Sequence, residues 1–294
     1  MQGALTVAAV RILSMSLLRH CLCWGVACAA TASADTVQQP LWEFGLGIGA
    51  LAFADYRGAD TSHAYPVPIP YLVYRGHFLR ADQDGVRGLL FNREVAELNI
   101  SVNATTPVRS HDSAARRGMA DLRPTVEIGP SLDLHLWHSA GRRARLDLRL
   151  PVRTALTVEP SPRSIGWSFA PRLNVDVADV GGRAGWNLGL LAGPLFAERR
   201  YHGYFYDVAP QFAAADRPAY QARGGYSGSQ ALVSLSKRFP AYWTGAFVRH
   251  DSLSGAAFAA SPLVRSNSYW TAGIGIAWMI GRSSSMVDAS EQRP

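Results

Sequence analysis

One stretch of this sequence alternates between apolar and polar residues at every second position, and it constrains the fold more than any other feature. Between Ala144 and Val158 the apolar side of the pattern consists of Leu146, Leu148, Leu150, Val152, Leu156 and Val158. The charged side consists of Arg145, Asp147, Arg149 and Arg153. Successive side chains of a β-strand point to opposite faces, so this stretch predicts a strand with one apolar and one charged face. Its length suits a tilted strand that crosses a membrane, which needs about 9–11 residues.

The same alternation recurs along the chain and predicts an all-β protein. The further segments are 97–104, 125–137, 167–178 and 269–280. A soluble β-sandwich also has alternating strands, but those strands usually run about 5–6 residues. Membrane barrels gather aromatic residues in two girdles at the strand ends, where most tryptophans of this chain fall. These are Trp42, Trp137, Trp167, Trp186, Trp243, Trp270 and Trp278. The pattern therefore favours a transmembrane antiparallel β-barrel over a sandwich.

The connections between the predicted strands alternate in length from Ala96 onward. They are 105–123 (long), 138–143 (short), 159–166 (medium), 179–183 (short), 200–225 (long), 239–242 (short) and 254–267 (long). Outer-membrane barrels have short periplasmic turns and longer extracellular loops, so these segments account for eight strands. Three candidates precede them, 42–54, 67–75 and a broken segment 77–91. Because bacterial barrels have an even number of strands, we expect ten or twelve.

Three prolines alternate with other residues at the start of the candidate strand 67–75. Pro66, Pro68 and Pro70 would all lack ladder donors on the same side of a strand. This stretch is therefore expected to be an edge, a bulged entry to a strand or a loop folded inward.

The first 34 residues have the features of a cleaved signal peptide. Arg11 and Arg19 supply positive charge before an apolar stretch over 21–30, and Ala32-Ser33-Ala34 forms an A-x-A cleavage signal. We expect the barrel to occupy residues 35–281, followed by a polar, disordered tail over 282–294. Cys21, Cys23 and Cys28 all precede the cleavage site, so the mature chain is expected to have no thiol or disulfide. Beyond residue 34 no apolar run is long enough for a membrane helix. The expected location is the outer membrane of a Gram-negative cell.

Charged residues on the polar faces of the strands are expected to point into the barrel lumen. The candidates are Glu127, Asp133, Arg145, Asp147, Arg149, Arg153, Arg172 and Asp176. Such residues could select solutes in a channel. They could also form a salt-bridged network that fills a narrow barrel, which is the interpretation we favour. The net charge is +7, or +5 without Arg11 and Arg19. Export and the absence of basic residues clustered with aromatics argue against a nucleic-acid partner, and outer-membrane lipid is the expected contact.

The sequence contains no motif that predicts a cofactor, a metal site or an enzyme. A phosphate-binding loop and the H-x-x-x-H zinc pair are absent. His135 and His138 are three residues apart, which places them on opposite faces of a regular strand. Ser, His and Asp are adjacent at 110–112 and at 250–252, but adjacent strand residues point apart, so neither is a triad as it stands. An outer-membrane hydrolase is therefore only a distant alternative.

Four aromatic residues cluster in a predicted outer loop: Tyr201, Tyr204, Phe205 and Tyr206. They are expected either to bind a ligand or partner, or to continue the upper aromatic girdle.

Several short segments, in order along the chain, resemble the MipA/OmpV family of outer-membrane proteins, named for the MltA-interacting protein. They are 65–71 (YPVPIPY), 117–122 (RGMADL), 127–130 (EIGP), 204–208 (YFYDV), 225–229 (GYSGS), 245–249 (GAFVR) and 261–264 (SPLV). The resemblance implies a barrel without assigned catalytic residues and a scaffold role that joins a periplasmic murein (peptidoglycan) transglycosylase to a murein synthase. Other members are associated with adhesion, antigenicity or small-solute binding. We therefore expect a scaffold or binding barrel, with a small-solute channel as the alternative.

Overall fold

The computed structural model describes residues 38–76, 79–82, 85–92 and 95–288. The chain divides into two units, Met1–Asp35 and Thr36–Pro294, and the description below concerns the second. The predicted signal peptide and cleavage site, and the last six residues of the polar tail, lie outside the described residues. No helix in the described ranges is long and apolar enough to cross a membrane.

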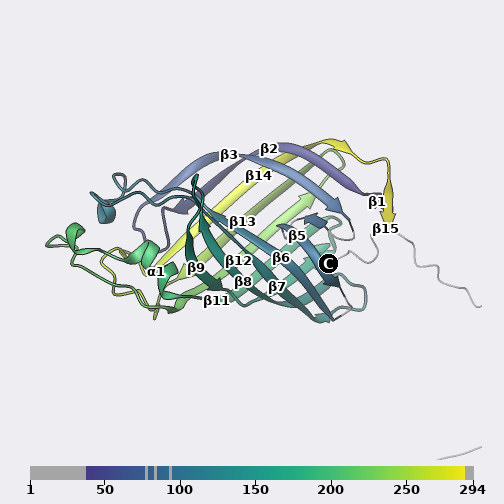
Figure 1. Cartoon of the computed structure of the whole chain (residues 1–294). Coiled ribbons are helices and arrows are strands. Elements are labelled where there is room, and N and C mark those ends of the chain that lie inside the picture. The colour runs from purple at the N-terminus through teal and green to yellow at the C-terminus, as the bar shows by residue number, and fades with distance from the viewer. Residues whose placement is uncertain (1–37, 77–78, 83–84, 93–94, 289–294) are drawn as a thin grey trace, which may run out of the picture. The chain divides into compact units, whose positions relative to one another are not determined.

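Antiparallel strands pair side by side in a sheet that closes on itself to form a barrel (Figure 1). The barrel strands are β2 (Trp42–Ala54), β3 (Ser62–Arg75), β4 (Leu79–Asp82), β5 (Gly85–Asn92), β6 (Ala96–Thr105), β7 (Thr125–His138), β8 (Ala144–Thr157), β9 (Ser164–Phe169), β10 (Arg172–Ala178), β11 (Trp186–Ala197), β12 (Gly225–Arg238), β13 (Tyr242–Ser252) and β14 (Ser268–Arg282). The helical elements are α1 (Arg199–Tyr206) and three 3-10 turns at Ala114–Arg116, Val180–Gly182 and Pro210–Phe212.

β9 and β10 are two halves of one strand. Both pair with β8 on one side and with β11 on the other, in a single register with β8. The break falls at Pro171, whose nitrogen has no hydrogen to donate to the ladder. When the two halves are counted once, the described strands occupy twelve positions around the barrel. The sequence had left ten or twelve strands open, and twelve is the larger number.

The predicted alternation of faces is confirmed along the wall. Ile274 and Trp270 of β14 point outward and are 63% and 65% exposed, whereas Asp147 of β8 points into the lumen and is 2% exposed. Because the outward face is apolar and the inward face is polar, the wall has the polarity of a membrane barrel rather than of a sandwich.

One local irregularity overturns a prediction from spacing. The register between β7 and β8 shifts between His135 and Trp137, where Leu136 is an extra residue. The bulge brings His135 opposite Asp147 and His138 opposite Arg145, so both histidines belong to the lumen face. The expectation that they lie on opposite faces was wrong, because a β-bulge changes the parity of every residue beyond it.

The two ends of the barrel differ as predicted. Long connections and α1 lie at one end, and short turns lie at the other (Figure 1). At the short-turn end the two ends of the described chain pair as a small ribbon, β1 (Gln38–Pro40) with β15 (Met286–Asp288). The disordered tail expected from the sequence is therefore wrong for residues 286–288, which gain a partner strand that a search for periodicity within the tail could not reveal.

The wall between β3 and β6 is incomplete toward the long-loop end. β3 pairs with β2 from Ser62 to Tyr74, but its pairs with β4 are limited to Tyr74 and Arg75. β6 pairs with β5 only as far as Ile100. Among the described strands, 62–73 of β3 and 101–105 of β6 thus have no partner on the sides that face each other, and we call this the lateral opening. Of the three structures considered for Pro66, Pro68 and Pro70, the edge strand is the one observed.

A charge placed on the outward face should be costly. Ile274 lies near the middle of β14, so Ile274→Arg puts a guanidinium at the level of the hydrocarbon core. We expect the free energy of unfolding to fall by about 2–4 kcal/mol, the usual cost of such a charge near the bilayer midplane. Urea titration of the protein refolded into lipid vesicles measures this, with Ile274→Val as the control. Equal midpoints for the two variants would contradict an outward, lipid-facing position.

Candidate functional site

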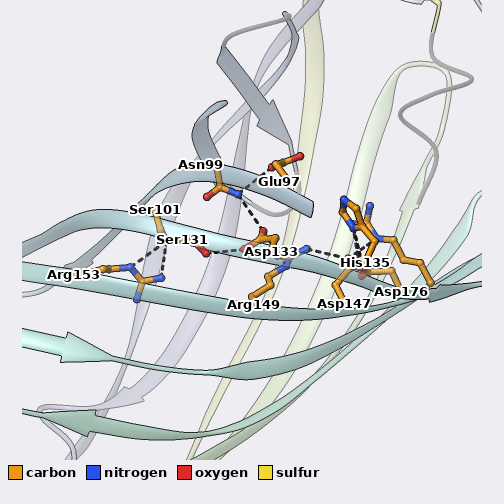
Figure 2. Close-up of polar contacts among 11 residues, drawn as sticks. Glu97, Asn99, Ser101, Ser131, Asp133, His135, Asp147, Arg149, Arg153 and Asp176 are labelled. Atoms are coloured by element: carbon orange, nitrogen blue, oxygen red, sulfur yellow. Dashed lines mark hydrogen bonds and ion pairs between the residues drawn. The ribbon is translucent and has the colours of Figure 1, made fainter. Parts of the chain in front are cut away.

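The lumen-facing charges form a connected belt across β6, β7, β8 and β10 (Figure 2). Asp133 accepts hydrogen bonds from Asn99 (3.1 Å) and Ser131 (2.6 Å), and it lies 3.6 Å from Nε of Arg149. Asp147 continues the belt toward the short-turn end. It lies 2.9 Å from Nδ1 of His135 and 3.1 Å from Nε of Arg145, which also reaches Asp176 at 3.2 Å. We call these residues, with Glu97, the lumen belt.

The structure places all eight predicted charged residues on the lumen face, but it divides them into two groups. Asp133, Arg145, Asp147, Arg149 and Asp176 are members of the belt. Glu127, Arg153 and Arg172 line a cavity closer to the long loops, together with Asp133 and Arg149 from the belt. Glu127 accepts hydrogen bonds from Ser168 (3.0 Å) and from the hydroxyl of Tyr201 (2.7 Å), and Arg153 donates to Ser101 at 2.6 and 3.0 Å.

Sequence reasoning missed two further ionic clusters in the lumen. Glu43 is 2% exposed and pairs with Arg75 of β3 at 2.9 Å and with Arg238 of β12. Asp251 is 1% exposed and pairs with Arg249 (2.7 Å) and with Arg57 (3.4 Å). Both carboxylates occupy inward positions of their strands, so the alternation that identified the other charges could have found them.

A cavity of about 370 Å³ lies between the lumen belt and the long loops. Its charged lining consists of five arginines and three carboxylates, a net charge of +2. These are Arg57, Arg149, Arg153, Arg172 and Arg249 with Glu127, Asp133 and Asp251. Ser227, Gln230 and Tyr201 are among its uncharged polar residues. The volume is in the range of small-molecule sites, and the charge favours an anion.

Four long connections pack on one another above this cavity, and we call them the loop cap. They are residues 55–61, 106–124, 198–224 and 253–267. Each contributes buried side chains to a shared apolar core, among them Tyr56, Leu122, Tyr206 and Phe258. The rings of Tyr206 and Phe258 stack with centroids 3.7 Å apart. Tyr56 donates a hydrogen bond to the carbonyl of Leu263 at 2.7 Å. The loops thus form a packed structure at the barrel mouth.

The predicted aromatic cluster belongs to this cap. Tyr206 is buried in its core, and Tyr204 and Phe205 pack against that core. Tyr201 points the other way, toward Glu127, and lines the cavity. Tyr206 thus packs inside the loops, which fits neither an exposed binding surface nor an aromatic girdle, whereas Tyr201 is placed to contact a ligand. Burial raises the pKa of Tyr201 well above its usual value, and the neighbouring Glu127 carboxylate adds to this, so its hydroxyl stays protonated as a donor.

His202 ties α1 to the barrel wall through a pair that the sequence did not reveal. Its Nε2 lies 2.6 Å from the hydroxyl of Ser227, and its Nδ1 lies 2.6 Å from the carbonyl of Arg223. That carbonyl can only accept, so Nδ1 carries the proton and Nε2 accepts from Ser227. Burial lowers the pKa of His202 and the charge of Arg57 adds to this, whereas the hydrogen bond to Arg223 opposes it. The buried imidazole is therefore neutral at pH 7.

The loop cap should loosen in acid because of His202. An unfolded histidine takes up a proton below about pH 6.5, whereas the folded one, with its lowered pKa, resists it. The stabilisation is thus complete above pH 6.5 and decreases as the pH falls, by up to tenfold in the opening equilibrium per pH unit. Hydrogen exchange of α1 at pH 7.5 and 5.0, corrected for intrinsic rates, measures this. The His202→Gln variant should lose the dependence, and an unchanged pH profile in that variant would assign the effect to another group.

The two Ser-His-Asp sequences do not form triads. Asp251 points into the lumen, whereas His250 packs against the ring of Trp270, a lipid-facing residue. In the other sequence His111 contacts Asp112 at 2.9 Å, but the hydroxyl of Ser110 donates to the carbonyl of Ala120 instead. No cluster of three metal-ligating side chains occurs among the residues described.

"Outer membrane protein OmpV" of Vibrio cholerae serotype O1 (strain ATCC 39315 / El Tor Inaba N16961) is 24% identical over 70% of this chain and 75% of its own length. Among solved structures, a NanC porin has a TM-score of 0.39 at 8% identity, covering 80% of this chain and 98% of its own. The CymD monoaromatic hydrocarbon channel has a TM-score of 0.26 at 11% identity, covering 84% of this chain and 68% of its own.

The family assignment rests on the sequence match. The model of the family described as "MltA-interacting protein MipA" matches residues 46–280, which is most of the chain and nearly all of the closed sheet. The resemblance seen in the short sequence segments is confirmed. This outer-membrane β-barrel belongs to the MipA/OmpV family.

Proposed function

We propose that this protein is a closed, non-catalytic scaffold barrel that holds periplasmic murein-processing enzymes, a transglycosylase and a synthase, at the outer membrane. The lumen belt is the observation that supports a barrel closed to ions and solutes. Its carboxylates are almost fully buried among their partners. Barrels of about eight strands are just filled by their own side chains, and in this wider barrel the lumen belt supports a lumen that is also occupied by side chains. The loop cap adds a packed layer at the outer mouth.

The partner follows from the family description, which names an interaction with MltA. On the barrel, a periplasmic partner would meet the short-turn end. That end carries the ribbon of β1 and β15 and two exposed apolar side chains, Val95 (69%) and Met286 (50%). Apolar side chains within a polar surround are common anchors of protein interfaces, which supports docking here.

Two measurements test the proposal. The refolded protein in a planar bilayer should give no stepwise current, and pulldown with a purified murein transglycosylase should retain that enzyme. Met286→Glu should weaken the capture, whereas Val158→Glu, the same kind of change at the long-loop end, should leave it intact. If the unmodified protein does not retain the transglycosylase, the scaffold role is wrong.

The alternative is a small-solute channel or binding porin, favoured by the cavity of about 370 Å³ and its net positive lining. Regular current steps that are blocked by a small anion would support this alternative and exclude the closed scaffold.

A further inference from the structure

The unpaired edge of β6 in the lateral opening borders the cavity. Residues 101–105, which have no partner on the side toward β3 among the described strands, all line the cavity. The cavity therefore reaches the part of the wall where the ladder between β3 and β6 is missing. On the opposite side, Tyr65 of β3 occupies an inward position and is still 47% exposed.

The free edge of β3 is suited to contact with an apolar molecule. β3 keeps an unbroken register with β2 from Ser62 to Tyr74, so the ladder uses the residues that alternate with the prolines. The nitrogens of Pro66, Pro68 and Pro70 then face the opening, and they have no hydrogen that needs a partner. An unsatisfied backbone donor in the hydrocarbon region costs several kcal/mol, so this edge avoids three such costs.

The cavity behind the opening is suited to an anion. Its charged lining carries a net charge of +2. Nη2 of Arg57 is buried without a hydrogen-bond partner, although its Nε contacts the hydroxyl of Tyr269 (3.2 Å) and the carboxylate of Asp251 (3.4 Å). Buried donors of charged groups are seldom left unsatisfied, so an acceptor at this position is to be expected. The ring of Tyr201 lines the same space, and its hydroxyl donates to Glu127, which leaves the arginines as the donors for an anion.

From these three features we infer that the cavity binds an amphiphilic anion. Its acidic head lies near Arg57, and its single apolar chain lies in the lateral opening between β3 and β6. The molecule enters sideways from the outer leaflet, because the loop cap covers the mouth above and the lumen belt lies below the cavity. This inference is independent of the scaffold role, which concerns the periplasmic end.

Binding of decanoate to the refolded protein in nonionic detergent tests the head and the chain. Native mass spectrometry should detect one bound decanoate, and neither decanol nor butyrate should bind comparably. Arg57→Gln should weaken binding about tenfold or more, since a hydrogen bond to a charged group is lost. Arg163→Gln removes the same charge from an exposed loop position and should have no effect. Should Arg57→Gln fail to fold, Gln230→Trp, which fills the cavity from β12, should also abolish binding.

A decanoate that carries a photoreactive diazirine in its chain tests the route. Cross-links should map to the lateral opening, near Val67 of β3 and Val102 of β6, and be suppressed by excess decanoate. Labels spread evenly over outward residues such as Leu190 and Val233 would indicate general lipid contact and overturn the inference. So would equal decanoate binding by the unmodified protein and both cavity variants, or none by the unmodified protein. Transglycosylase capture, measured on the same preparations, tests the scaffold role separately.

Discussion

Replacing Phe258 by alanine is expected to release the loop cap while the barrel wall stays folded. Phe258 is 1% exposed, and its ring stacks on Tyr206 at 3.7 Å and meets the edge of His202 at 4.6 Å. Removing a buried phenylalanine side chain costs about 3–5 kcal/mol, because apolar burial is lost and a cavity remains. This loss of stability affects the loop cap, because its loops depend on this shared core. The ladder hydrogen bonds of the wall are not affected.

Limited trypsin digestion measures the release. The loop over 198–224 contains Arg199, Arg200 and Arg223 as cleavage sites, whereas Arg217 is protected by the proline that follows it. A loss of 3 kcal/mol in local stability raises the open population more than a hundredfold, and initial cleavage should accelerate accordingly. The wall is followed by the shift in gel mobility between heated and unheated samples, which should persist. Phe239→Ala, the same change in the short turn that joins β12 to β13, is the control and should leave loop cleavage unchanged. Loss of the mobility shift in Phe258→Ala would show that the cap and the wall fold as one unit.

The loop cap also shows what the sequence could not predict, namely how the long loops pack on one another. The positions of the long loops followed from their lengths, but their packing did not. The contacts that build the cap join residues far apart in the chain, such as Tyr56 with Leu263, and no local pattern encodes such pairs. The aromatic residues at 201–206 were visible as a cluster, yet whether an aromatic faces a ligand, a lipid or a core depends on those distant partners.

The wall was largely predictable because its physical cause is local. A strand between lipid and a polar lumen must alternate, so residues such as Leu148 and Arg149 reveal their faces directly. Predictions failed where a single residue changed the parity, as at Leu136, or where the partner came from the other end of the chain, as with β1 and β15. The lateral opening depends on how far β4 and β5 extend, which the broken segment at 77–91 did not disclose.

Prediction of the lumen charges is limited in the same way, because their partners come from other strands. Glu43 provides the clearest test. Alternation identifies which side chains point inward, but the register of neighbouring strands decides which charges meet. Glu43 of β2 joins Arg75 of the adjacent β3 and Arg238 of β12, so one carboxylate connects strands that are not neighbours in the sheet. Glu43→Ala leaves both guanidiniums without that partner. Arg75 and Glu43 form a buried pair, with side chains 13% and 3% exposed, so breaking it leaves uncompensated charge and we expect a loss of about 3–5 kcal/mol in the free energy of unfolding.

Urea unfolding in lipid vesicles measures this loss. Glu159→Ala is the control. It removes a carboxylate from an ion pair with Arg163, whose side chain is 71% exposed, and such pairs contribute about 0–1 kcal/mol. It also removes the acceptor of a hydrogen bond from Thr157, which adds about 1 kcal/mol. Glu43→Gln keeps the shape and one acceptor oxygen, so it should fall between Glu43→Ala and the unmodified protein. If Glu43→Ala were no more harmful than Glu159→Ala, the two guanidiniums would have to reach water at the short-turn end once the carboxylate is gone. Arg238 is already 42% exposed and can be solvated without the carboxylate, so the expected loss comes mainly from Arg75, whose side chain is only 13% exposed.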